Sequence, residues 1–179
     1  FLHIKSISDS LNNTIEHLNE IVKIQTEITN ERTVIEFEPV FKNIMRALKS
    51  NIEALNATIE YDFTQCPQIS YIPAYMESIL QNLLTNSLKY SDPERKPVIK
   101  CHTLKQRNHI YLIFEDNGVG IDMERYGDKV FGMYKTFHQN PDAKGIGLFI
   151  TRNQIEALGG TIKIDSTVNI GTKFTIRLL

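Results

Sequence analysis

The stretch EDNGVGID at residues 115–122 follows directly on HIYLIF, a run with the pattern of a strand. Asn117-Gly118 alone is typical of a two-residue hairpin turn, and a hairpin stays one open reading. A hairpin needs a returning strand, however, and the following residues, VGIDMERYGDKVFG, do not alternate. A two-residue turn also has no role for the second glycine, Gly120. The stretch therefore favours a loop that leaves the end of a strand and lines a pocket with Asp116 and close-lying backbone.

Strand-like and helix-like patterns alternate through the rest of the chain. We expect strands at 33–38, 57–63, 69–72, 98–104, 109–115, 161–166 and 172–178, the fourth and fifth as an antiparallel pair. We expect helices at 40–55, 73–91 and 145–160, the first two opened by Pro39 and Pro73. No long periodic element covers 117–144, which indicates a functional loop or lid. This order predicts an α+β fold, a two-layer α/β sandwich with helices on one face of a mixed sheet.

Residues 1–28 have the pattern of one long helix with an apolar stripe at heptad-like spacing. The rest of the chain offers this stripe no evident partner, so we expect a bundle whose other helices are missing or belong to a second chain. The polar run TNERT at 29–33 marks the boundary, which predicts two domains, 1–30 and 31–179. Because the first residue is Phe1 and not Met, we also expect the chain to be part of a longer protein.

Composition excludes several classes of function. With 41% hydrophobic and 23% charged residues the chain can bury an ordinary core, and its net charge of −1 gives no general attraction to nucleic acid. No apolar run approaches the length of about 18 residues that a membrane span needs. Cys66 and Cys101 form no CxxC motif and are expected to be buried or free cytosolic thiols. The chain is therefore expected to be cytoplasmic, either on its own or as the cytoplasmic part of a membrane-bound receptor. The five histidines show no metal-ligand spacing.

Asn82, Asn86 and Lys89 fall on the side of the 73–91 helix opposite its apolar face. A solvated polar face is one reading of this pattern. Against it, Asn is a poor helix former and occurs here twice, four residues apart. A side-chain amide also offers a carbonyl oxygen, which is a suitable ligand for Mg²⁺.

Two further segments carry weaker signals. KGIGLFI at 144–150 places Gly-x-Gly at a helix start, where free N–H groups bind phosphate, although a plain loop-to-helix junction has the same pattern. In VFGMYKTFHQN at 130–140, Phe131, Tyr134 and Phe137 recur every three residues. They indicate an aromatic patch on the core, which we expect for Phe131 in either case, or the hinged part of a lid.

In their order and spacing, these motifs together with GTKF at 171–174 resemble the ATP-binding catalytic domain of sensor histidine kinases. The resemblance covers residues 31–179 and implies the Bergerat-type ATP fold that gyrase, mismatch-repair and chaperone ATPases share. Residues 1–28 resemble the second helix of the dimerization and histidine-phosphotransfer domain. The implied activity is transfer of the γ-phosphoryl group of ATP to a histidine on that domain, for relay to a response-regulator aspartate. The acceptor is absent from this chain, because His3 and His17 do not match the acceptor motif, and a homodimer is implied for the full protein.

The resemblance also implies roles for single residues. Asp116 accepts a hydrogen bond from adenine, and Asn86 binds Mg²⁺. The implied catalytic residues for phosphoryl transfer are Asn82, Lys89, Lys135 and Lys144. The implied nucleotide-binding positions are Asn82, Asn86, Lys89, Tyr90, Asp116, Gly118, Gly120, Ile121, Tyr134, Lys144, Gly145, Ile146, Gly147, Leu148 and Thr172.

The sequence departs from the family's pattern at the lid. Ala143 replaces a glycine of the second glycine motif, Lys144 replaces a small residue, and Thr136 stands where an arginine is common. We hypothesise that Lys135 or Lys144, with His138, supplies the missing positive charge to the γ-phosphate.

Asn82 stands where hydrolytic relatives carry a glutamate that activates water. An amide is not a general base, so the sequence argues for phosphoryl transfer and against efficient hydrolysis. A second hypothesis, a non-catalytic module that binds nucleotide for dimer signalling, is favoured by the altered lid. The intact Asn82/Asn86 pair speaks against it, because adenine binding alone does not need both amides.

Overall fold

Five strands form one mixed sheet in the computed structural model, which describes residues 31–132 and 146–178. Their order across the sheet is β2 (Thr58–Asp62), β4 (Val98–Gln106), β5 (His109–Asp116), β7 (Gly171–Leu178) and β6 (Thr161–Thr167). The β2–β4 pair is parallel and the other pairs are antiparallel, so the predicted pairing of β4 with β5 is confirmed. β5 is the middle strand and ends at Asp116.

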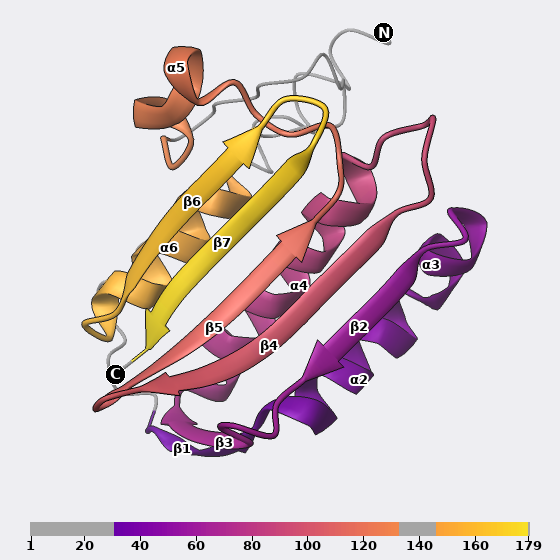
Figure 1. Ribbon diagram of the computed structural model, residues 1–179. Coiled ribbons are helices and arrows are strands. Elements are labelled where there is room, and N and C mark those ends of the chain that lie inside the picture. The colour runs from indigo at the N-terminus through magenta and orange to yellow at the C-terminus, as the bar shows by residue number, and fades with distance from the viewer. Residues whose placement is uncertain (1–30, 133–145, 179) are drawn as a thin grey trace, which may run out of the picture. The chain divides into compact units, whose positions relative to one another are not determined.

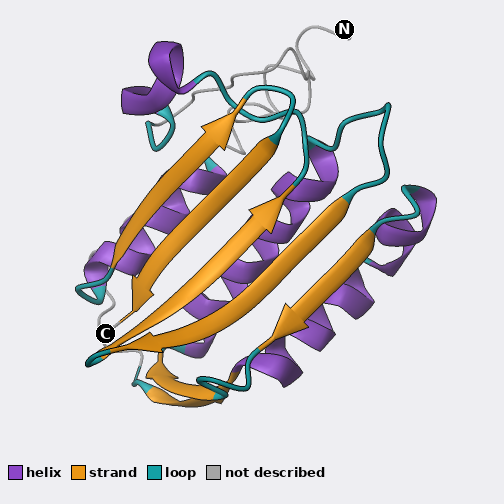
Figure 2. Cartoon of the chain, viewed as in Figure 1, coloured by secondary structure: helices purple, strands orange, loops and turns teal. Residues whose placement is uncertain are grey.

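Three helices cover one face of this sheet: α2 (Phe37–Ala47), α4 (Pro73–Lys89) and α6 (Gly147–Ala157) (Figures 1 and 2). α4 supplies the largest part of the core. Its apolar stripe is fully buried and consists of Met76, Ile79, Leu80, Leu83 and Leu84. Each such side chain stabilises the fold by about 1.5–3 kcal/mol. The predicted two-layer α+β sandwich is confirmed.

The opposite face of the sheet carries charge. Glu60, Lys100, Glu115 and Lys173 stand next to one another across four strands. Lys100 pairs with Glu60 at 3.4 Å, and Lys173 pairs with Glu115 at 2.8 Å. These side chains are about half exposed, so each pair contributes at most about 1 kcal/mol. This face of the sheet is therefore exposed to solvent.

The start of the described chain differs from the prediction. The first strand, β1 (Thr33–Glu36), is shorter than expected, and α2 begins at Phe37, before Pro39. Phe37 is fully buried against the ring of Phe63, and its N–H donates to the carbonyl of Pro67 at 3.0 Å, which turns the chain inward. Proline is tolerated in a first helical turn, because the N–H it lacks would have no helical partner there.

The helix expected over 40–55 is divided at Leu48. The second part, α3 (Lys49–Ala54), buries no residue, so no core contact aligns it with α2. β1 also does not join the main sheet but pairs with β3 (Gln68–Tyr71) in a separate two-stranded sheet. Strand patterns alone do not identify a pairing partner, which is why the sequence did not indicate this second sheet.

After β5 the chain forms short helical turns, α5 (Met123–Tyr126) and η1 (Gly127–Lys129). The Asp122 carboxylate caps α5 by accepting the N–H of Arg125 at 3.0 Å. The remaining lid residues, 133–145, lie outside the described residues, as do 1–30, so the helix over 1–28 and the domain boundary stay predictions. Within the described ranges no helix is long and apolar enough to cross a membrane.

Candidate functional site

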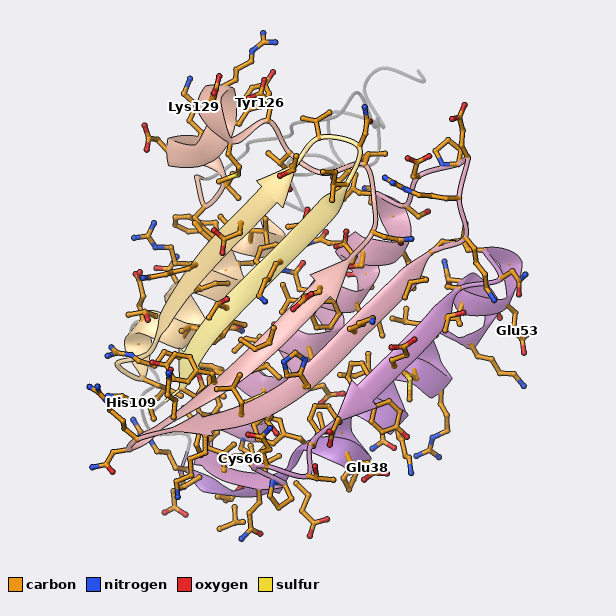
Figure 3. The ribbon with its side chains drawn as sticks, in the orientation of Figure 1. Glu38, Glu53, Cys66, His109, Tyr126 and Lys129 are labelled. Carbon is orange, nitrogen blue, oxygen red and sulfur yellow. The ribbon has the colours of Figure 1, made fainter. Side chains whose placement is uncertain are left out.

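Four segments that are far apart in the sequence lie together at one end of the main sheet. They are the C-terminal half of α4, the end of β5, the start of α6 and the turn between β6 and β7 (Figure 1). Tyr126 of α5 and Lys129 of η1 lie at this end as well, whereas His109 lies at the other (Figure 3). Most of the described site residues that the sequence indicated are in these segments.

Asp116 is the last residue of the middle strand and is held on both carboxylate oxygens. The Ser87 hydroxyl donates to Oδ2 at 2.7 Å, and the Gly118 N–H donates to Oδ1 at 2.9 Å. Burial raises the pKa of Asp116, although these hydrogen bonds act in the opposite direction. A carboxylate has about four acceptor positions, so Asp116 can still accept from an amine. The site therefore presents a fixed acceptor at the end of β5.

Ser87 is a site residue that the sequence did not indicate. It lies on the core-facing side of α4 and is 3% exposed, yet its hydroxyl is used by Asp116. The available signal was a serine among leucines on an apolar helix face. A buried hydroxyl needs a hydrogen-bond partner. The carboxylate of Asp116, at the end of the strand expected over 109–115, was a candidate for that partner.

The hairpin reading of Asn117-Gly118 is wrong. Instead of turning back, Asn117 extends the contact with β4: its Oδ1 accepts the N–H of Val98 at 2.8 Å, and its Nδ2 donates to the carbonyl of Lys96 at 3.0 Å. The Arg95 guanidinium donates to the carbonyl of Gly118 at 2.9 Å. The loop after β5 is thus fixed to the segment that follows α4.

Both glycines of this loop are required by the protein's own backbone. A Cβ on Gly118 would lie 2.5 Å from the carbonyl oxygen of Tyr90. Gly120 has φ +68°, and a Cβ there would lie 2.0 Å from the carbonyl oxygen of Thr167. Ile121 follows and donates its N–H to Ser166 Oγ at 2.8 Å. The loop is therefore packed between the end of α4 and the β6–β7 turn.

Asn82 does not belong to a solvated face. Its Nδ2 donates to Thr151 Oγ1 on α6 at 2.7 Å, and its Oδ1 accepts a long hydrogen bond from Asn86 Nδ2 at 3.4 Å. Thr151 is 1% exposed and is the second site residue that the sequence missed. The two asparagines of α4 are thus linked in one hydrogen-bonded chain that ends at the Thr151 hydroxyl on α6.

Gly147 is the first residue of α6, which begins two residues later than predicted. A Cβ on Gly147 would lie 2.2 Å from Asn82 Oδ1, so the helices approach closely here. The N-cap residue of α6, Ile146, forms no side-chain cap, and the first N–H groups of a helix have no partner within the helix, so they suit an anion. Ile146, before it, is 2% exposed and Leu148 is half-buried.

Lys89, Tyr90 and Thr172 complete the described site. The Lys89 ammonium lies 5.8 Å from the centroid of the Tyr90 ring, and burial raises the pKa of Tyr90. Thr172 stands opposite Asp116 in the β5–β7 ladder, and its hydroxyl lies 2.9 Å from Ser166 Oγ. The Thr172 hydroxyl and the Asp116 carboxylate therefore lie on neighbouring strands at the same end of the sheet.

The lid residues named from the sequence, Tyr134, Lys135, His138, Lys144 and Gly145, lie outside the described residues. Before them, Phe131 is only half-buried, with the Arg152 guanidinium 5.6 Å from its ring centroid. The neighbouring Val130, at 2% exposure, takes the core position that we expected for Phe131.

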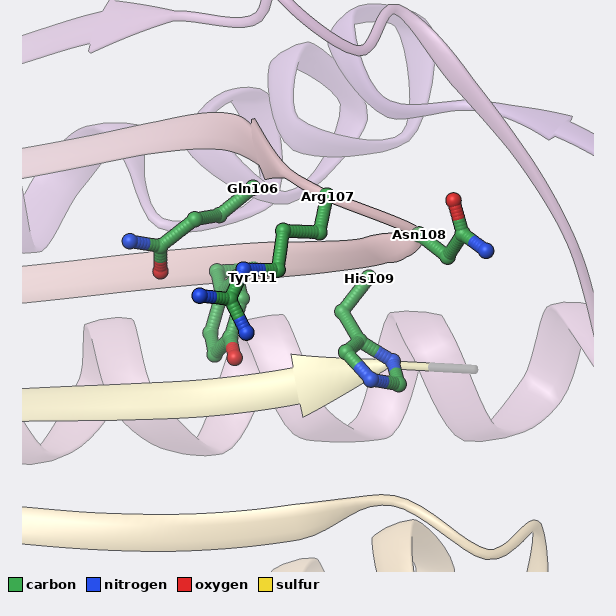
Figure 4. A pocket seen from close by; sticks show the side chains of 5 residues that line it. All are labelled: Gln106, Arg107, Asn108, His109 and Tyr111. Atoms are coloured by element: carbon green, nitrogen blue, oxygen red, sulfur yellow. The ribbon is translucent and has the colours of Figure 1, made fainter.

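A hollow elsewhere does not belong to this site. It is lined by Gln106, Arg107, Asn108, His109 and Tyr111 at the β4–β5 turn (Figure 4). His109 begins β5 and Asp116 ends it, so the strand's full length separates the hollow from the carboxylate. Among the described residues, no group of three or more His, Cys, Asp or Glu side chains is placed to hold a metal ion.

Comparison with known proteins gives consistent matches. The family model described as histidine kinase-, DNA gyrase B-, and HSP90-like ATPase matches residues 72–179. The histidine protein kinase SaeS of Staphylococcus aureus (strain MW2) is 25% identical over 177 residues, which cover 96% of this chain and 50% of SaeS. The sensor protein RprX of Bacteroides fragilis is 32% identical over 135 residues, 73% of this chain and 24% of RprX. The chain thus spans half or less of these relatives.

Solved structures share the fold. The Acinetobacter baumannii histidine kinase AdeS superposes with a TM-score of 0.76 at 20% identity, covering 99% of this chain and 82% of that one. The catalytic domain of histidine kinase ThkA superposes with a TM-score of 0.71 at 19% identity, covering 83% of this chain and 95% of that one.

Proposed function

The chain belongs to the family of histidine kinase-, DNA gyrase B- and HSP90-like ATPases, and from that membership we propose that it phosphorylates a histidine of its own parent protein. It is the catalytic ATP-binding domain of a histidine kinase. In the proposed reaction the γ-phosphoryl group of ATP passes to a histidine on an upstream dimerization domain, and from there to a response-regulator aspartate. The parent protein acts as a homodimer with this domain in the cytoplasm.

The observation that carries the proposal is the position of Asp116. A partly buried carboxylate, held by Ser87 and by the Gly118 N–H, ends the middle strand beside the packed glycine loop. An acceptor of this kind suits the exocyclic amine of adenine, because an amine donates and a carboxylate only accepts. Thr172, opposite Asp116 in the β5–β7 ladder, would add a hydroxyl beside the same ring.

The phosphate end of the site is formed by α4 and α6. The N–H groups at the start of α6, at Gly147 and Leu148, suit phosphate oxygens. Lys89, exposed on the last turn of α4, adds positive charge.

Asn86 fits a role as Mg²⁺ ligand. Its side-chain Nδ2 donates a hydrogen bond to Asn82 Oδ1, which leaves its side-chain oxygen, Oδ1, as the ligand atom. Mg²⁺ commonly takes few protein ligands and completes its shell with phosphate oxygens and water. When bound, the ion neutralises charge on the phosphates. Asn82 itself is bonded to Thr151 and has no basic atom, which supports phosphoryl transfer over hydrolysis.

The lid lysines complete the proposal. Lys135 and Lys144, with His138, would supply the positive charge that an arginine supplies in many relatives. The test is phosphotransfer to a separately supplied dimerization domain by Lys135→Ala and Lys144→Ala. Full rates in both variants would contradict this role and leave the rest of the site intact.

The binding step is tested by calorimetric titration with a non-hydrolysable ATP analogue, with and without Mg²⁺. We expect binding that Mg²⁺ strengthens and that Asp116→Asn abolishes. A chain that binds the analogue but never phosphorylates a supplied dimerization domain would favour the alternative, a nucleotide-binding signalling module. A wild-type chain that binds no nucleotide would refute the proposal.

A further inference from the structure

We propose that Thr151 on α6 is a positioning residue for the metal ligand Asn86 and acts through Asn82. The inference rests on the proposed function, since it concerns the Mg²⁺ site of that function. The sequence resemblance assigns no role to Thr151, which stands six residues after Gly145 on a turn of α6 that faces α4.

The first link is the hydrogen bond between the two helices. Asn82 Nδ2 donates to Thr151 Oγ1 at 2.7 Å, and the two residues are 69 positions apart in the chain. Thr151 is 1% exposed, so water does not replace its hydroxyl as partner. The Asn82 side chain is itself partly buried, and an amide N–H that loses its acceptor there is left unsatisfied, which is unfavourable. This contact therefore fixes the side chain of Asn82.

The second link is the direction of the amide. An asparagine side chain has a donor end and an acceptor end, which a 180° rotation exchanges. With Nδ2 on Thr151, Oδ1 of Asn82 faces Asn86 and accepts its Nδ2–H at 3.4 Å. That bond leaves the side-chain oxygen of Asn86, Oδ1, free of Asn82, so that it can bind a cation. If Asn82 were rotated, two NH₂ groups would face each other, and Asn86 would have to turn its own NH₂ toward the metal.

The third link is the close approach at the start of α6. A Cβ on Gly147 would lie 2.2 Å from Asn82 Oδ1. Gly147 and Thr151 are four residues apart and lie on one face of the helix. This face therefore offers Asn82 a matched pair of contacts, space for its oxygen at Gly147 and an acceptor for its nitrogen at Thr151.

The test is Thr151→Val, which keeps the side-chain shape and removes the acceptor. The intact 179-residue chain is first saturated with the non-hydrolysable ATP analogue, and Mg²⁺ is then titrated by calorimetry. Loss of a residue that orients a metal ligand commonly weakens metal binding about 10- to 100-fold. We expect that loss in Thr151→Val, recovery in Thr151→Ser, and unchanged affinity for the analogue without metal.

Ser78→Ala is the matched control. Ser78 Oγ accepts from Gln154 Nε2 at 3.1 Å, which is another α4–α6 hydrogen bond, away from the asparagines. Its loss should leave Mg²⁺ affinity unchanged. Wild-type Mg²⁺ affinity in Thr151→Val, or an equal loss with and without metal, would overturn the inference alone. A wild-type chain that binds the analogue but not Mg²⁺ would overturn it together with the proposed metal role.

Discussion

Gly120 is the position in the site loop where a single methyl group should be most damaging. Its φ of +68° is a left-handed conformation, which costs an alanine about 1–2 kcal/mol. The added Cβ would also lie 2.0 Å from the Thr167 carbonyl oxygen. A backbone atom cannot rotate away, and such overpacking costs about 1–3 kcal/mol. Together these terms predict that Gly120→Ala lowers the free energy of unfolding by about 2–5 kcal/mol.

Thermal unfolding followed by circular dichroism measures this loss. In a chain of this size 1 kcal/mol shifts the midpoint by about 2–4 °C, so we expect a decrease of about 4–20 °C. Gly127→Ala is the control, because Gly127 has φ −51° and its Cβ would meet only Met123 Cε, at 3.4 Å. That variant should be unchanged or more stable by about 0.4–1 kcal/mol. Equal midpoints for the two variants would refute the reasoning.

Two further predictions concern the same loop. Burial raises the pKa of Asp116 above its ordinary value of 3.8, so its contribution to stability is complete below that value and is lost as pH rises through the raised pKa. Asp116→Asn should remove this slope in urea unfolding measured from about pH 3 to 7. Arg95→Met removes the donor to the Gly118 carbonyl together with the ion pair to Asp92, so it should cost about 1 kcal/mol and weaken nucleotide binding measured by calorimetry. Lys96→Met, a change of equal charge at an exposed side chain, should do neither.

The sequence predicted the parts of the site that depend on local pattern. β5 and its end at Asp116 follow from alternation and the glycine loop, and α4 follows from a stripe of period 3.6. The uses of Ser87 and Thr151 do not follow, because their partners lie 29 and 69 residues away and only packing brings them together. β1 was indicated as a strand, but its pairing of Thr33 with Tyr71 is equally non-local.

The start of α2 shows a different limit. Pro39 is a helix-start signal, yet the helix begins at Phe37, because burying that ring against Phe63 outweighs the local preference. The division at Leu48 is also absent from the pattern, since the apolar spacing continues through α3 while the core does not.

The middle position of β5 has a consequence for solvent exchange. Its main chain is paired on both sides, with β4 and with β7, so its amides should exchange for deuterium only when the whole sheet opens. Asp116 therefore belongs to the slowest-exchanging part of the domain. The loop it introduces, residues 117–121, is held by single contacts and should exchange by local opening. Nucleotide binding would then be recorded as slower exchange in that loop, while β5 reports the stability of the entire domain.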